Sequence, residues 1–428
     1  MLRRLLLLLL PAFAWASPAT PPSDPTPETD LVYVFILSRH GIRSAIANNE
    51  SLGKYAATPW PDWEVAPGIL TPHGRSQMVL MGSYYHADYV RQGLLTGQPA
   101  ADAGRIFYRS DNDERTIVSD EALGEGLTPG IPAQVHYIHG RTKDPLFSPS
   151  WLSIGRPDQA LAQAAVLGRI GGKPELLLAE HRASMDALEK ILLGGSITPA
   201  DNSPSLELLT NMEQSLGTVH MAEKLAEAIL LQYADGKPLS AVGWGRLRPI
   251  DIMPLTDLVS LGFYQYRAPY VAQVSASNLA AHLLATLAQA ASGHPVPGAL
   301  GRPGDRMAVL GGHDGNVVAL ATLLGGHWQV PGTVADLPLP GGALIFELRR
   351  NRGDGRYVVR TKYVVQTYEQ MRANSALSPE HPPAISPMFI PDCSSAGPGY
   401  DAPLDRFSAH VQAALDPRFT APEPAEVQ

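Results

Sequence analysis

Short apolar runs of strand length recur in the first and last parts of the chain. Residues 31–37 form such a run, rich in Val, Ile, Tyr and Phe, which is typical of a buried strand in an α/β sheet. Residues 105–108 and 307–310 are similar strand-like runs. Residues 343–349 and 357–367 flank the turn sequence Asn-Arg-Gly-Asp-Gly, a pattern that predicts a hairpin. The hydrophobic pattern therefore predicts a sheet assembled from both parts of the chain.

Helical segments follow three of these runs. Residues 72–93 predict a helix with a proline at its first position and Thr71 as its cap. Residues 114–123 predict a second helix, for which Asp111 is a candidate cap. A third helix is expected over residues 316–324. Strands followed by helices favour an α/β fold with a mostly parallel sheet flanked by helices.

Residues 158–292 differ from the rest of the chain, because they are rich in Ala and Leu and predict helices rather than strands. The expected helices cover residues 159–167, 173–193, 213–233 and 276–291. We interpret this segment as a mainly α domain that is inserted into the sheet domain and covers the mouth of its site. The α/β domain then comprises residues 30–157 and 293–416.

The first residues have the pattern of a secretory signal peptide. Two arginines precede the leucines of residues 5–10, and Ala14-Trp15-Ala16 offers small residues at a cleavage site. The alternative is a membrane anchor, but this run is far shorter than the roughly 20 residues that span a bilayer, and no later segment is expected to be long and apolar enough. We predict removal of residues 1–16, a periplasmic or secreted protein, and no membrane association afterwards. Proline-rich residues 17–29 and residues 417–428 predict a flexible lead-in and tail.

Length, charge and cysteine content limit the size of the fold, its partners and its cross-links. A chain of 428 residues with 45% hydrophobic residues can bury a large core and divide into two domains. The formal net charge of -8 offers no basic surface for nucleic acid. Cys393 is the only cysteine, so no intramolecular disulfide is possible. We interpret Cys393 as a buried or incidental thiol.

The motif Arg39-His40-Gly41-Ile42-Arg43 directly follows residues 31–37. Ligands of α/β sheets bind beyond the carboxyl ends of the strands. Planar guanidinium groups suit phosphate oxygens, and an imidazole between them can attack phosphorus. On these five residues alone a solvated surface turn is the favoured interpretation, so this motif does not establish a site by itself.

Two more constellations favour the chemical interpretation. Gly311-Gly312-His313-Asp314-Gly315-Asn316 follows residues 307–310 and adds a carboxyl group that can donate a proton. Ser110-Asp111-Asn112-Asp113-Glu114-Arg115-Thr116 adds an arginine at a strand-to-helix junction. Asp314 has an alternative role as a helix cap. His313 has an alternative role as a metal ligand, but no second and third ligand with metal-site spacing accompanies it.

Together these motifs resemble the histidine acid phosphatase family, the branch of the phosphoglycerate mutase-like superfamily that includes bacterial phytases and glucose-1-phosphatases. Weaker matches run in the family's order: Leu-Thr-Pro-His-Gly at 70–74, Asp-Pro-Leu-Phe at 144–147, Gly-Trp-Gly-Arg at 243–246 and Pro-Gly-Gly-Ala at 340–343. The resemblance implies a phosphoglycerate mutase-like fold and an acid phosphatase that acts on small phosphomonoesters.

The resemblance also implies roles for single residues. It assigns the nucleophile to His40 and the general acid to Asp314. The phosphate clamp falls on Arg39, Arg43, Arg115 and His313. Glu227 resembles a pocket carboxylate of the bacterial relatives. The implied reaction is a two-step phosphoryl transfer through a phosphohistidine, in which the arginines stabilise the charge and no metal or cofactor is required.

The chain also departs from the family pattern. Ser44 and Ala45 stand where a proline usually follows the second arginine, and the lysine that bacterial phytases often carry in this loop is absent, since the next lysine is Lys54. The natural substrate, a sugar phosphate or phytate, therefore stays open. Two alternative functions are a non-catalytic phosphate-ester binding protein and a phosphoglycerate mutase-type phosphotransferase.

Overall fold

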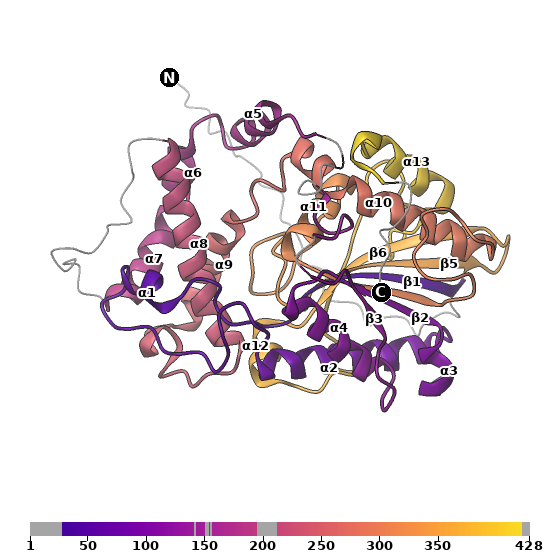
Figure 1. Ribbon diagram of the computed structural model, residues 1–428, viewed down its shortest axis with the longest axis horizontal. Helices are drawn as coiled ribbons and strands as arrows, with labels where there is room; N and C mark the ends of the chain where they lie inside the picture. Colours follow the sequence, from indigo (N-terminus) through magenta and orange to yellow (C-terminus); the bar gives the residue numbers. More distant parts are fainter. Residues whose placement is uncertain (1–27, 141–142, 150–153, 155, 195–211, 422–428) are drawn as a thin grey trace, which may run out of the picture.

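The computed structural model describes residues 28–140, 143–149, 154, 156–194 and 212–421. The predicted signal peptide and most of the predicted lead-in lie outside the described residues. A sheet domain and a group of helices lie side by side, with the site described below at their junction (Figure 1).

One mixed sheet forms the core, with strand order β3-β2-β4-β1-β5-β6-β7 and with β8 paired to β6. The parallel half consists of β1 (Thr29–Arg39), β2 (Ile106–Ser110), β3 (Val135–His136) and β4 (Met307–Gly312). The antiparallel half consists of β5 (Ala343–Asn351), β6 (Tyr357–Val365), β7 (Ala384–Pro387) and β8 (Ala402–Pro403). The α/β fold class is confirmed, and the predicted hairpin is the β5–β6 pair. The parallel half is the part of the sheet that carries the predicted site.

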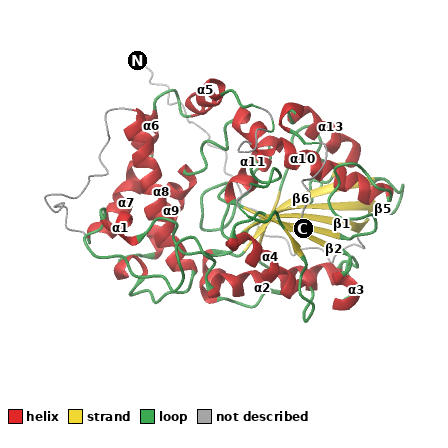
Figure 2. Ribbon diagram, in the orientation of Figure 1, coloured by secondary structure: helices red, strands yellow, loops and turns green. Residues whose placement is uncertain are grey.

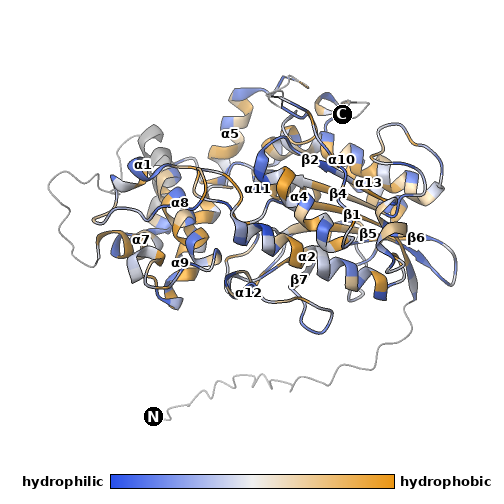
Figure 3. Ribbon diagram, turned by 60° about the horizontal axis from the view of Figure 1, so that its bottom comes forward, coloured by the Kyte–Doolittle hydropathy of each residue, from blue (hydrophilic) through white to orange (hydrophobic). Residues whose placement is uncertain are grey.

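Residues 31–37 of strand β1 are apolar because helices cover both faces of the sheet (Figure 2). Successive side chains of a strand point to opposite faces. Val34 and Ile36 accordingly pack with residues of α2 (Pro72–Arg91) and α4 (Glu114–Leu127). Phe35 and Leu37 pack on the other face with α10 (Pro269–Ser292) and α11 (Asp314–Leu324). Figure 3 shows hydrophobic residues along the strands and on the helices packed against them.

The predicted helix starts are confirmed for both α2 and α4, but the predicted cap is confirmed only for α2. Thr71 caps α2 by accepting a hydrogen bond from the Gly74 amide, 2.9 Å away. Asp111 does not cap α4, whose N-cap residue is Asp113. The sequence pattern could not separate these two aspartates, which lie two residues apart at the end of β2.

The helical domain comprises α5 (Gln159–Arg169), α6 (Pro174–Glu180), α7 (Arg182–Leu193), α8 (Met212–Ala234) and α9 (Ile252–Leu261). The single helix predicted over residues 173–193 is wrong, because the backbone leaves the helical conformation at His181. The periodicity continues across that break, which hides it from the sequence. Helix α9 was not predicted.

Helix α10 contacts α11, α13 (Leu404–Ala414) and β1, so it packs with the sheet domain. The domain boundaries stay a proposal, and this packing favours an insertion that ends before α10. By length and composition, α10 is also the one helix of the described residues that passes the criteria for a membrane span, against the expectation that no such segment follows the leader. Most of its apolar window is buried in the protein, as in a core helix.

The remaining helices are short: α1 (Asn49–Gly53), α3 (Pro99–Ala103), α12 (Tyr368–Ala373) and the 3-10 helices η2 (Val242–Gly245), η3 (Pro249–Asp251) and η4 (Pro417–Phe419). Helix η4 corrects the prediction of a flexible tail from residue 417, because Phe419 is buried beside Tyr270 with ring centroids 6.3 Å apart. Residues 422–428 lie outside the described residues. Cys393 is buried as expected, and burial raises the pKa of its thiol to about 11.

Candidate active site

The parallel register of the sheet brings the three motifs to one edge. Strand β4 lies between β1 and β2, with Arg39 opposite Gly312 and Ser110 opposite Gly311. The loops that follow β1, β2 and β4 therefore leave the sheet side by side. All six residues assigned from the sequence lie at this edge; contacts described below connect five of them directly, and Glu227 joins the sixth, Arg43, to Arg39.

His40 is buried in the loop after β1. Its Nδ1 lies 2.8 Å from the Gly41 carbonyl oxygen, which can only accept a hydrogen bond. Nδ1 must therefore carry the hydrogen, and Nε2 keeps its lone pair. Gly41 is required by close packing, because a Cβ at this position would lie 2.8 Å from Met78 Cγ and 2.9 Å from the Gly74 carbonyl oxygen.

The imidazole of His40 is held uncharged. Burial disfavours the protonated form, and the positive charges of Arg39, Arg43 and Arg115 disfavour it further, so the pKa of His40 lies well below its usual value. An uncharged imidazole with an available Nε2 lone pair is a nucleophile.

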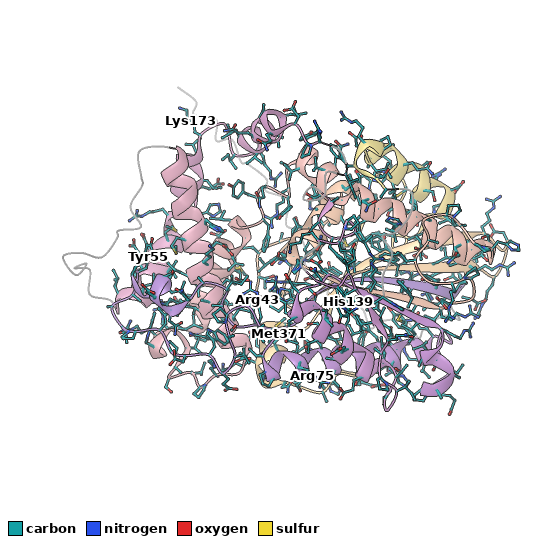
Figure 4. All side chains as sticks on the ribbon, viewed as in Figure 1. Arg43, Tyr55, Arg75, His139, Lys173 and Met371 are labelled. Carbon is teal, nitrogen blue, oxygen red and sulfur yellow. The ribbon has the colours of Figure 1, made fainter. Side chains whose placement is uncertain are left out.

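Two arginines of the first motif are fixed by Glu227, which α8 supplies from the helical domain. Arg39 Nη2 lies 2.9 Å from Glu227 Oε1, and Arg43 Nη2 lies 3.0 Å from both carboxylate oxygens. Figure 4 shows Arg43 between the two domains. Although burial raises the pKa of Glu227, the charges of Arg43 and Arg39 lower it more, so this carboxyl is ionised. The sequence resemblance correctly placed Glu227 in the pocket.

His313 and Arg115 form the opposite wall. His313 Nε2 lies 2.8 Å from Asp111 Oδ2, and Arg115 Nη2 lies 2.7 Å from Asp113 Oδ2. The two walls are close, since the His40 and His313 rings have centroids 5.8 Å apart. Sequence reasoning missed the roles of both aspartates. Their position at the carboxyl end of a predicted strand could have indicated that they belong to the site.

Asp314 points into the site and is not the cap of α11. Its Oδ2 lies 3.0 Å from Arg39 Nη2, and its Oδ1 accepts a hydrogen bond from the Gly315 amide at 2.7 Å. His313 occupies the N-cap position, where its amide donates to the Asn316 side chain. Although burial raises the pKa of Asp314, the charges of Arg39 and His313 lower it below its usual value.

These groups line a cavity of about 340 Å³ that contains His40, Arg43, Arg115, His313 and Asp314. A second cavity of about 540 Å³ adjoins it and extends along α8. A third cavity, of about 710 Å³, lies beside β2 and β3 and is lined by none of the six residues. We assign the chemistry to the 340 Å³ cavity, called the inner cavity below, because the imidazole of His40 and the guanidinium groups of Arg43 and Arg115 meet there.

The structure corrects the expectation that His313 has no neighbouring metal-ligand residues. Ligand atoms of Asp111, Asp113 and His313 lie within 4.8 Å of one another. Each is already engaged within the protein, and the positively charged Arg115 lies 3.4 Å from His313 Nδ1. A fixed cation at that distance opposes the binding of a second cation.

Comparisons with known proteins identify relatives over nearly the whole chain. Residues 30–364 match the model of the histidine phosphatase superfamily (branch 2). The phytase AppA of Escherichia coli strain K12 is 30% identical over 413 residues, which cover 90% of this chain and 93% of that protein. The glucose-1-phosphatase of Salmonella typhimurium is 27% identical over 404 residues, covering 89% and 92%. The solved structure of Hafnia alvei phytase in complex with tartrate has a TM-score of 0.80 and 29% identity, covering 93% and 100%.

Proposed function

Because the chain belongs to branch 2 of the histidine phosphatase superfamily, and is a histidine acid phosphatase, we propose that it hydrolyses phosphomonoesters in two steps through a phosphohistidine on His40. The observation that carries this proposal is the uncharged imidazole of His40 among three arginines. A binding protein needs the cations but has no use for a nucleophile.

In the first step, Nε2 of His40 attacks phosphorus and the bond to the leaving oxygen breaks. The Gly41 carbonyl accepts the Nδ1 hydrogen and so stabilises the positive charge that develops on the ring. Donors on Arg39, Arg43 and Arg115 bind the equatorial oxygens, which supplies the charge stabilisation that phosphoryl transfer needs.

The Nε2 hydrogen of His313 is directed at Asp111, which leaves Nδ1 with its lone pair facing the site. Arg115 Nη2 lies 3.4 Å from Nδ1 and can donate to it, so His313 helps to orient this arginine on the phosphate. Burial opposes ionisation of Asp111, but the hydrogen bond and charge of His313 outweigh it and lower the pKa of Asp111. The ionised Asp111 in turn fixes the orientation of the His313 ring.

Asp314 donates a proton to the leaving oxygen and, as a carboxylate, later activates the water that hydrolyses the phosphohistidine. In the structure its carboxyl is paired with Arg39 and favours the ionised form. A bound phosphate pairs with Arg39, which weakens the interaction of Arg39 with Asp314. The phosphate also adds negative charge beside Asp314. Both effects raise the pKa of Asp314 in the complex, so substrate binding itself favours the protonated Asp314 that the first step needs.

We expect the purified protein to release inorganic phosphate from p-nitrophenyl phosphate, with p-nitrophenol formed in equal amount. A binding protein would retain the ester intact. A mutase-type phosphotransferase would pass the phosphoryl group to a second phosphorylated substrate and release little phosphate. Measuring both products over the first minutes of turnover separates the three functions.

Activity is expected to persist well below pH 6.5, the usual pKa of histidine. Only the neutral imidazole attacks phosphorus, so activity falls as the pH drops through the pKa of His40, which burial and the three arginines depress. The measurement is kcat/KM for p-nitrophenyl phosphate between pH 3 and 7, because kcat/KM reports the pKa values of the free enzyme. An acid limb centred near pH 6.5 contradicts the depressed pKa.

Turnover is also expected to be independent of metal, since three arginines occupy the place where a metal would neutralise the phosphate charge. Dialysis against a strong chelator should leave kcat within about 20% of its initial value, because no ion takes part in phosphoryl transfer. Loss of activity that a divalent ion restores would assign the metal role to Asp111, Asp113 and His313.

We further propose that the enzyme acts in the periplasm or outside the cell, on the basis of the signal-peptide pattern in residues 1–16. The substrate is a small phosphomonoester, either a sugar phosphate or phytate.

A further inference from the structure

The 540 Å³ cavity, called the outer cavity below, begins at the proposed general acid. It shares Arg43, Ile46, Tyr266 and Asp314 with the inner cavity, so the two form one continuous space. Because Asp314 protonates the leaving oxygen, the alcohol part of the substrate must extend past Asp314. The outer cavity is where that alcohol lies.

The lining of the outer cavity is acidic and aromatic. It includes three carboxyl groups and three aromatic rings: Glu223, Glu227, Asp314, Phe263, Tyr264 and Tyr266. Its two permanent cations are Arg43, which is already bound to Glu227, and Lys224. Among the described residues Lys224 forms no ion pair, so it is the one lining cation that is not neutralised.

Glu223 is a lining residue of the outer cavity that has no role in the proposed reaction. It lies one helical turn before Glu227 on α8, so both carboxyl groups are on the same face. Its side chain is only 12% exposed, and its one ion-pair contact within the described residues is with His220 Nδ1 at 3.5 Å. A Cβ at Gly262 would lie 2.8 Å from Glu223 Cγ, so the end of α9 packs directly on the Glu223 side chain.

Burial, followed by the charges of Glu227 and Asp314, raises the pKa of Glu223 to about 8. Over the acidic and neutral range Glu223 therefore carries a hydrogen. An undissociated carboxyl group both donates and accepts hydrogen bonds, as a hydroxyl group does.

We propose that Glu223 is a specificity-determining residue, which binds hydroxyl groups of an uncharged alcohol in the outer cavity and disfavours alcohols that carry further phosphate groups. The inference rests on the proposed function, because it places the leaving group by the role of Asp314. A hydroxylated ring fits the lining, since its faces pack on aromatic side chains while its hydroxyls pair with carboxyl groups.

Further phosphates fit this cavity poorly. Each brings negative charge close to the ionised Glu227 and leaves the accepting oxygen of Glu223 without a donor. Lys224 alone can compensate for one such group, whereas inositol hexakisphosphate carries five phosphates besides the one that reacts. The structure thus favours a monophosphate of a neutral polyol over phytate.

The test compares Glu223→Ala, Glu223→Gln and the unaltered enzyme at about pH 5. Three substrates separate the contributions: glucose 1-phosphate has hydroxyls on a neutral alcohol, phenyl phosphate has none, and inositol hexakisphosphate has further phosphates. Glu180→Ala is the matched control, since Glu180 is exposed at the end of α6 and outside both cavities.

The unaltered enzyme is expected to prefer glucose 1-phosphate to inositol hexakisphosphate in kcat/KM. Glu223→Ala should lower kcat/KM for glucose 1-phosphate roughly 3- to 10-fold, which is the value of one or two hydrogen bonds, and leave phenyl phosphate within about 2-fold. Glu223→Gln should retain most of the activity on glucose 1-phosphate, because an amide also donates and accepts.

Two results would overturn the inference while leaving the phosphatase function intact: a preference of the unaltered enzyme for inositol hexakisphosphate, or an equal effect of Glu223→Ala on glucose 1-phosphate and phenyl phosphate. Failure of the unaltered enzyme to hydrolyse phenyl phosphate at all would instead overturn the proposed function, and this inference with it.

Discussion

Replacing His40 with alanine is expected to abolish measurable phosphate release, with a loss on the order of 10⁴- to 10⁶-fold in kcat, as for the nucleophiles of other covalent enzymes. The substitution removes the buried imidazole on which the charges of three arginines act, the proposed nucleophile. The arginines stay, so the variant should still bind phosphate. The measurements are phosphate release from p-nitrophenyl phosphate and binding of inorganic phosphate by calorimetry.

The matched control is His294→Ala, which removes an exposed histidine after α10 and should keep full activity. Thermal unfolding of both variants shows whether His40→Ala is folded. Wild-type turnover by a folded His40→Ala protein would assign the nucleophile to another residue. Loss of phosphate binding together with turnover would mean that His40 has mainly a structural role.

The parallel half of the sheet explains why so much of the site was predictable. Each motif directly follows an apolar run, and parallel strands bring their carboxyl ends to one edge. Knowing that β1, β2 and β4 are strands was therefore sufficient to expect that His40, Arg115 and Asp314 meet. That these three strands are neighbours, with β4 between β1 and β2, is what the structure adds.

The charge partners of the site were harder to predict for two different reasons. Glu227 lies 188 residues from Arg39 along the chain and reaches the site only because α8 packs at its mouth. Only the family resemblance pointed to it. Asp111 was visible but was misinterpreted as a helix cap, since the pattern of a cap and the pattern of a histidine partner are the same in sequence.

Errors in the helices have a common physical cause. The hydrophobic period of residues 173–193 continues through the break at His181, because both α6 and α7 face the same core. Likewise α10 is apolar enough for a membrane because it is buried between other elements of the sheet domain. The hydrophobic periodicity of a sequence indicates which residues are buried, but it does not indicate which helices or strands they pack against.

The assignment of separate roles to His40, as nucleophile, and to Asp314, as general acid, is tested most directly by Asp314→Asn. Asparagine keeps the size of the side chain but cannot donate a proton to an alkoxide, so kcat for an alkyl phosphate should fall about 10²- to 10⁴-fold. For p-nitrophenyl phosphate we expect less than about 10-fold in the first step, because its leaving group needs little protonation.

The same variant should make the intermediate visible. Asp314 also activates the water of the second step, so phosphohistidine formed rapidly from p-nitrophenyl phosphate should accumulate on His40 and be trapped by acid-free quenching of labelled substrate. Phosphate binding should not weaken, because the uncharged amide of the variant no longer competes with phosphate for Arg39. Asp186→Asn, which alters a partly exposed aspartate on α7, is the matched control and should behave as the unaltered enzyme. An equal decrease for alkyl and p-nitrophenyl phosphates, with no trapped phosphohistidine, would show that Asp314 orients Arg39 rather than transferring the proton.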